Sequence, residues 1–128
     1  MQHFNLEDIK AFSKIYRLNM INSITGYKSA NMIGTRSSSG KENVAVFSSI
    51  THLGSDPALL HFTLRPNTVP RDTYKNIKEN KVFTVNHVSV TQIEDAHHTS
   101  ARYHEDISEF DQTLLESEYK LNWDAPFV

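Results

Sequence analysis

Residues 34–50 read GTRSSSGKENVAVFSSI, and residues 71–76 read RDTYKN. In the first stretch, residues 43–49 alternate between two faces, which predicts a strand that follows a loop rich in hydroxyl side chains. The second stretch opens a short predicted helix, with Arg71 and Thr73 at its start. Short hydroxyl side chains, an arginine and the free N–H groups of a helix start are groups that bind phosphate. The two stretches therefore predict a site for a phosphorylated small molecule.

The other secondary-structure elements are predicted from the spacing of apolar residues. Strands that mostly neighbour each other along the chain, with helices between them, are typical of a small mixed barrel of the α+β class. We therefore expect a single domain, residues 1–128, built as a mixed β-barrel with helices. The predicted elements are helices over residues 6–24, 71–80 and 91–103, a last short helix opened by a capping box at residues 106–109, and strands over residues 29–35, 43–49, 59–65 and 82–88.

Two of these elements are expected to be half buried. Strict alternation of apolar and polar residues over 59–65 predicts that one face of this strand packs on the core. In the second predicted helix, Asp72 or Thr73 is expected to cap the N-terminus. The buried side of that helix is expected to carry Tyr74 and Ile77, which lie three residues apart.

Composition excludes several classes of protein and site. The chain has 128 residues, of which 38% are hydrophobic, so it can bury the core of one domain. Its net charge of −2 predicts no binding to nucleic acid or to an anionic membrane surface. The absence of cysteine excludes disulfides, thiol catalysis and thiolate metal sites. No apolar run suits a membrane span or a signal peptide, so we expect a cytoplasmic protein.

Other metal and catalytic sites are not predicted. His98 points about 100° away from His97 on a helix, and His104 lies about 10.5 Å further along the axis, so one helix cannot bring the three to one metal. The glycines never reach the GxGxxG or P-loop spacing, and no serine lies in a nucleophile elbow. Trp123, Tyr103, Phe110 and Tyr119 are expected to fill the core or a subunit interface rather than to stack on a ligand.

The order of these motifs resembles the flavin reductase-like, FMN-binding split-barrel family, and within it the flavoredoxin-type branch. The resemblance runs from about Met20 to the C-terminus. The segments that carry it are NMIGT, ENVAVFSS, SDPALLHFTLRP, RDTYKNIKENKVFTVN, HHTSARY, ISEFD and APFV, in this order. It implies that FMN lies against the barrel and that no side chain acts as a catalytic acid or base.

The resemblance also implies which residues contact the cofactor. The edge of the isoalloxazine ring is expected to be hydrogen-bonded by the backbone from Asn43 to Phe47. Asp72 is expected to cap the helix with its carboxylate turned away from the phosphate. The ring and ribityl positions match Thr35, Ser37, Asn43, Ala45, Ser48 and Ser49, and the phosphate end matches Arg71, Thr73 and Asn76.

The function that the resemblance implies is a flavin oxidoreductase in which NAD(P)H reduces the flavin for an unknown acceptor. Members are typically homodimers in which both subunits wall the flavin. The alternative is a non-catalytic flavin-binding or electron-transfer module, or a split barrel that only dimerises. Family members continue beyond the segment that matches APFV with further strands, so we expect a barrel that is incomplete at its C-terminus. An unpaired sheet edge would then be covered by a partner subunit, or the flavin pocket would be partly dismantled.

Overall fold

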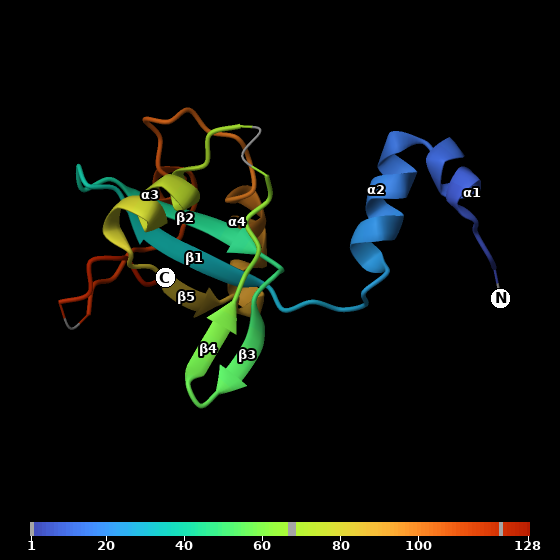
Figure 1. Ribbon diagram of the computed structural model, residues 1–128. Coiled ribbons are helices and arrows are strands. Elements are labelled where there is room, and N and C mark those ends of the chain that lie inside the picture. The colour runs from blue at the N-terminus through green and yellow to red at the C-terminus, as the bar shows by residue number, and fades with distance from the viewer. Residues whose placement is uncertain (1, 67–68, 121) are drawn as a thin grey trace.

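The centre of the fold is a three-stranded antiparallel sheet in the order β2-β1-β5 (Figure 1). The computed structural model describes residues 2–66, 69–120 and 122–128. The three strands are β1 (Asn31–Arg36), β2 (Glu42–Phe47) and β5 (Thr84–His87). They confirm the strands expected over residues 29–35, 43–49 and 82–88, with ends that differ by one or two residues.

The register of the sheet separates its side chains into two faces. Thr35 lies opposite Asn43, and Ile33 lies opposite Ala45, so these four side chains share one face. Helix α3 (Asp72–Asn80) covers this face, as Figure 1 shows. The opposite face is covered by α4 (Ile93–His98), the short helix η2 (Glu109–Gln112) and the C-terminal segment.

The hydrophobic core lies on the opposite face from α3. Met32 and Val44 project from the sheet and pack with Ala96 of α4 and Leu115, and all four are buried. The C-terminal segment is tied to the same face, because the Thr84 hydroxyl donates to the carbonyl of Pro126. The face under α3 carries the buried polar side chains of Thr35 and Asn43 beside the buried Ile33.

A separate hairpin, β3 (Thr51–Ser55) and β4 (Ala58–His61), projects from the body of the molecule (Figure 1). The prediction of a half-buried strand over residues 59–65 is wrong in extent and in burial, because β4 ends at His61 and its residues are exposed. A strand before the turn at residues 54–57 was not predicted. The polar and turn-forming residues of β3 give little apolar alternation.

The N-terminal helix expected over residues 6–24 is divided into α1 (Leu6–Ala11) and α2 (Lys14–Ser23). The break has a local cause, since Phe12 is extended and the Ser13 side chain caps α2 by accepting from the Tyr16 N–H. Figure 1 shows both helices lying apart from the sheet. Among the described residues, no helix is long and apolar enough to cross a membrane.

The last two predicted helices are shorter than expected. The segment expected over residues 91–103 forms the 3₁₀ turn η1 (Val90–Gln92) followed by α4. The capping box expected at residues 106–109 is shifted by two residues, because Ser108 and Asp111 form it and open η2. The sequence predicted Asp106 as the N-cap residue, whereas Ser108 is the N-cap in the structure.

Candidate functional site

Helix α3 buries polar side chains against the sheet, not the apolar ones expected. Thr73 and Asn76 are 5% and 3% exposed, whereas Tyr74 is exposed and Ile77 is only partly buried. The prediction that Tyr74 and Ile77 share the buried side is therefore wrong. Burial of a threonine and an asparagine requires hydrogen-bond partners, and the sheet supplies them.

The partners of α3 are the two facing residues of β1 and β2. The amide of Asn43 donates to the hydroxyls of Thr35, at 3.2 Å, and Thr73, at 3.1 Å. The amide of Asn76 donates to the same Thr35 hydroxyl at 3.1 Å. This buried network, defined as Thr35, Asn43, Thr73 and Asn76, fixes α3 on the sheet. Each threonine hydroxyl accepts in these bonds and keeps its own proton for another acceptor.

The N-terminus of α3 has no side-chain cap. Its N-cap residue is Arg71, which makes no capping hydrogen bond, so the expected capping by Asp72 or Thr73 is wrong. The Nε of Arg71 is buried without a hydrogen-bond partner among the described residues. An unpaired guanidinium N–H beside uncapped helix N–H groups favours an anion. Because a buried unpaired donor costs free energy in the chain alone, the arrangement suits an anionic ligand.

A cavity of about 320 Å³ opens on the other side of the buried network. Its walls carry charges of both signs, and carboxylates outnumber amines, which does not suit a dianion. Asp72 lines it, and Arg71 does not. Ser37, expected at the ribityl end, lies here in the β1–β2 turn, where its hydroxyl accepts from the Lys41 N–H. The cavity is lined by Ser37, Ser39, Lys41, Glu42, Asn43, Asp72, Lys75, Asn76, Glu105 and Asp106.

Strand β2 places Ala45 and Phe47 on the same face as the buried network. Its backbone N–H groups, however, already have partners inside the chain. The N–H of Val44 donates to Glu109 Oε2 at 3.2 Å and that of Val46 to the Thr99 hydroxyl at 2.9 Å, while alternation directs the others toward β1. A ring edge bound by the N–H groups of Val44 or Val46 would compete with these bonds.

The residues that follow β2 meet the loop after β4. Phe47 contacts Phe62 edge-to-face, with ring centroids 5.4 Å apart. Ser49 Oγ donates to the carbonyl of Thr63 and accepts from its N–H, both at 3.1 Å, which occupies the hydroxyl. Ser48 is exposed. Of the two serines, Ser48 is therefore the one whose hydroxyl has no hydrogen bond to the described residues.

Glu109 was expected only as the last residue of a capping box, yet it supports β2 by accepting from the Val44 N–H. Burial raises the pKa of its carboxyl above the usual 4.5, against the lowering effect of its hydrogen bond with the Val44 N–H. A raised pKa in the folded state means that the folded chain binds more protons than the unfolded chain. The contribution of this carboxyl to the free energy of unfolding is therefore fully present below pH 4.5. It is lost as the pH rises through the pKa that the carboxyl has in the folded chain.

Glu109→Gln should remove this pH dependence. The amide keeps an oxygen that accepts from the Val44 N–H but does not ionise. We expect the free energy of unfolding of the wild-type chain to fall relative to that of the variant as the pH rises from 4 to 7, measured by urea denaturation. A difference that stays constant over this range would contradict the assignment.

A second, open cavity of about 570 Å³ lies near the C-terminus. Arg36 donates to Asp124 at 2.6 Å across it and lies over the ring of Tyr119, 5.5 Å from the centroid. Trp123, expected in the core or at a subunit interface, lines this cavity and is 48% exposed. Over residues 2–66, 69–120 and 122–128, no three of the His, Asp and Glu side chains gather as metal ligands.

Comparison with known proteins places residues 26–128 in the family described as Flavin reductase like domain. Among solved structures, the chain is similar to a split-barrel protein from Shewanella frigidimarina NCIMB 400 that is provisionally described as a flavin reductase. The identity is 44% and the TM-score 0.94, covering 99% of this chain and 63% of that one. The split-barrel resemblance expected from the sequence is confirmed. No curated protein matches the chain.

Two further structures share the fold. The 2-nitrobenzoate 2-nitroreductase NbaA of Pseudomonas fluorescens has 22% identity and a TM-score of 0.80, with 98% of this chain and 59% of that chain covered. Flavoredoxin of Desulfovibrio vulgaris (Miyazaki F) has 22% identity and a TM-score of 0.70, with 80% and 55% covered. This chain therefore spans less than two thirds of the length of each of the three structures.

Proposed function

We propose that this chain, which belongs to the flavin reductase-like domain family, binds FMN and serves as an oxidoreductase in which NAD(P)H is the reductant. One domain, residues 1–128, is proposed to carry the binding residues. The observation that carries the proposal is the start of α3, where a buried arginine N–H has no partner in the part of the chain that the structure describes and the helix N-terminus has no side-chain cap. Both features stabilise a dianionic phosphate.

The proposed phosphate site consists of Arg71, the first N–H groups of α3 and the hydroxyl of Thr73. The buried network continues from it toward the sheet, and its Thr35 and Asn43 groups are polar partners for the ribityl chain. The ring would lie beyond, along Ala45, Phe47 and the start of the loop that follows. This order of phosphate, ribityl and ring follows one face of the sheet, which supports FMN over an unphosphorylated flavin.

The chemistry that bound flavin supplies is acceptance of a hydride from NAD(P)H and release of electrons to an acceptor. The chain's part is to bind and orient. The network holds its hydroxyls in place through buried hydrogen bonds, so no reorganisation is needed when a ligand arrives. Neither Thr35 nor Thr73 changes its protonation state in this role, and no side chain is assigned as an acid or base.

The experiment that tests the proposal is a visible spectrum of the purified chain with FMN, followed by NADH or NADPH under anaerobic conditions. Bound flavin that bleaches on addition of either nucleotide supports the oxidoreductase. Bound flavin that stays yellow with both would overturn the reductase role and favour a flavin-binding or electron-transfer module. A chain that binds no flavin would overturn both, leaving a split barrel without a cofactor.

A homodimer is part of the proposal, because a partner subunit would supply the wall that this chain lacks over the ring. The mass of one chain is 14.7 kDa. Sedimentation velocity at micromolar concentration should give a particle of twice this mass. On dilution, the dimer should dissociate at a lower chain concentration with FMN present than without FMN, because the ligand would stabilise the dimer by linkage. A stable monomer in both conditions would contradict the shared pocket.

A further inference from the structure

Two amide oxygens of the buried network have no hydrogen-bond partner in the chain. Asn43 and Asn76 are 4% and 3% exposed, and the Nδ2 of each donates to the hydroxyl of Thr35. One hydroxyl carries one proton and cannot donate to both amides, so the shared contact turns the carboxamide nitrogens toward Thr35 and the oxygens away from it. No N–H or O–H group of residues 2–66, 69–120 and 122–128 donates to the Oδ1 of either asparagine.

Both asparagines line the cavity of about 320 Å³. Their Oδ1 atoms are not sealed inside the protein, because in the described part of the chain the Nε of Arg71 is the one buried side-chain nitrogen or oxygen without a partner. An acceptor that has no partner in the chain and is not sealed off is open to water or to a ligand in the cavity that its residue lines. The two oxygens therefore suit a ligand that carries N–H or O–H donors.

The charges on the cavity wall favour a cation among such ligands. Four carboxylates and two amines line the cavity, which gives a formal charge of −2. The amine of Lys41 is already engaged, because its Nζ donates to the carbonyl of Glu105. The carboxylate of Asp72 forms no ion pair with a described residue. Asp72 lies four residues before Asn76, so the two side chains share one side of α3 and can act on the same ligand group.

We propose that this cavity binds a protonated aliphatic amine. The ammonium group donates to the amide oxygens of Asn43 and Asn76 and pairs with the carboxylate of Asp72. Over the described residues, no three carboxylates or histidines gather as metal ligands, so an organic cation suits the site better than a metal ion. Arg71 does not line the cavity, and the amine site therefore stands apart from the proposed phosphate site. Asn43 is common to the amine site and the proposed flavin site, so the test is made without FMN.

Titration of the nitrogen-15-labelled chain with putrescine, a linear diamine, tests the site by NMR at low salt and neutral pH. The side-chain amide resonances of Asn43 and Asn76 should shift with putrescine and stay in place with butanediol, which has the same carbon chain without charge. Asp72→Asn should weaken putrescine binding about fivefold, the size of one exposed ion pair. The spectra of each variant also show whether it is folded.

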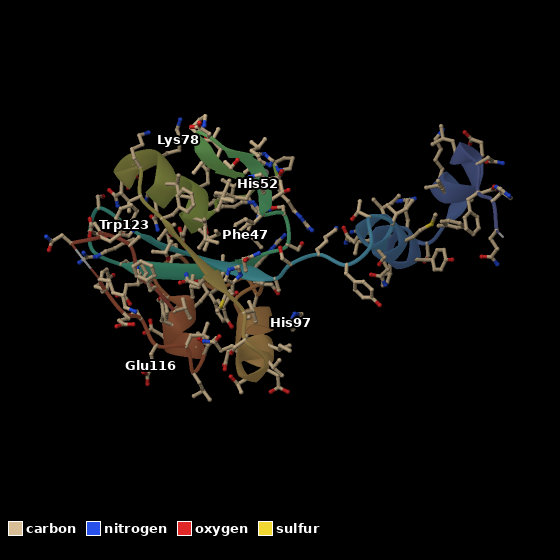
Figure 2. The ribbon with its side chains drawn as sticks, turned by 90° about the horizontal axis from the view of Figure 1, so that it is seen from below. Phe47, His52, Lys78, His97, Glu116 and Trp123 are labelled. Carbon is tan, nitrogen blue, oxygen red and sulfur yellow. The ribbon has the colours of Figure 1, made fainter. Side chains whose placement is uncertain are left out.

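Lys75 provides the sharpest variant, because its amine lines the cavity and competes with a cationic ligand. Lys75→Met should strengthen putrescine binding about threefold. Lys78→Met is the matched control and should leave the affinity unchanged, since Lys78 does not line the cavity and Figure 2 shows it on the side of α3 turned away from the sheet.

Three results would overturn the amine site. They are no shift of the two asparagine resonances with putrescine at millimolar concentration, an equal shift with butanediol, and equal or weaker putrescine binding in Lys75→Met than in the wild-type chain. Weaker binding in that variant would mean that the lysine contacts the ligand, which a cation does not allow. FMN titration of Lys75→Met judges the flavin proposal separately, so each proposal can fail without the other.

Discussion

Arg71→Ala weakens FMN binding by about tenfold to a hundredfold while leaving riboflavin affinity nearly unchanged. A hydrogen bond to a charged group contributes about 1.5–3 kcal/mol, and each 1.4 kcal/mol is a factor of about ten in Kd. Riboflavin lacks the phosphate and so loses nothing when the guanidinium is removed. Titration of each flavin into wild-type and variant chains, followed by quenching of flavin fluorescence, measures both affinities.

The same variant has a second signature, in stability without ligand. Because the Nε of Arg71 is buried and unpaired among the described residues, its removal relieves a desolvation cost. The free energy of unfolding of the apo variant should therefore equal or exceed that of the wild-type chain. Lys78→Ala is the matched control, since it removes one positive charge from the exposed side of the same helix. If Lys78→Ala loses as much FMN affinity as Arg71→Ala, the loss is an effect of net charge. If Arg71→Ala loses affinity for FMN and riboflavin equally, Arg71 does not act on the phosphate.

Gly34→Ala is expected to be the most destabilising single change in the sheet. A Cβ at this position would collide with the backbone carbonyl of Pro126 and with the Thr84 hydroxyl that donates to it. Both are buried and neither is the free end of a flexible side chain, so the C-terminal segment must leave the sheet or the strand must shift. Overpacking costs about 1–3 kcal/mol in the free energy of unfolding, and we expect this change to lie at the upper end of that range.

Gly26→Ala provides the comparison for that change. A Cβ at Gly26 meets no atom within 4 Å, but its φ of +77° is unfavourable for alanine and costs about 1 kcal/mol. Urea denaturation followed by far-UV circular dichroism and by the fluorescence of Trp123, the only tryptophan, gives both values. A loss at Gly34 no larger than that at Gly26 would mean that the C-terminal segment does not press on β1.

The sheet could be predicted because its signal is local. Alternation over residues 43–49 predicts two faces, and the pairing of Ala45 with Ile33 and of Phe47 with Asn31 agrees with Ala45 and Phe47 sharing one of them. The burial of α3 could not be predicted in the same way. Apolar periodicity favours Tyr74 and Ile77, whereas the helix is oriented by hydrogen bonds between residues as far apart as Thr35 and Asn76. Such contacts depend on the packing of distant segments and leave no periodic pattern in the sequence.

The candidate site was predicted as a set of residues but not as an arrangement. The structure brings Thr35, Asn43, Thr73 and Asn76 into direct contact and leaves Ser37 at a cavity of mixed charge. It also gives the β2 N–H groups partners such as Glu109, which no spacing rule links to β2. The N-terminal segment illustrates the converse case, because periodicity predicts one helix over residues 6–24 but cannot tell where it breaks into α1 and α2.

The phosphorus-31 resonance of FMN, recorded with a slight excess of the wild-type chain, tests the central claim most directly. If the phosphate binds at the start of α3, the resonance shifts and broadens with the wild-type chain and with Lys78→Ala, and returns toward its free position with Arg71→Ala. A resonance that stays at its free position with the wild-type chain, or one that shifts equally with all three chains, would contradict the account.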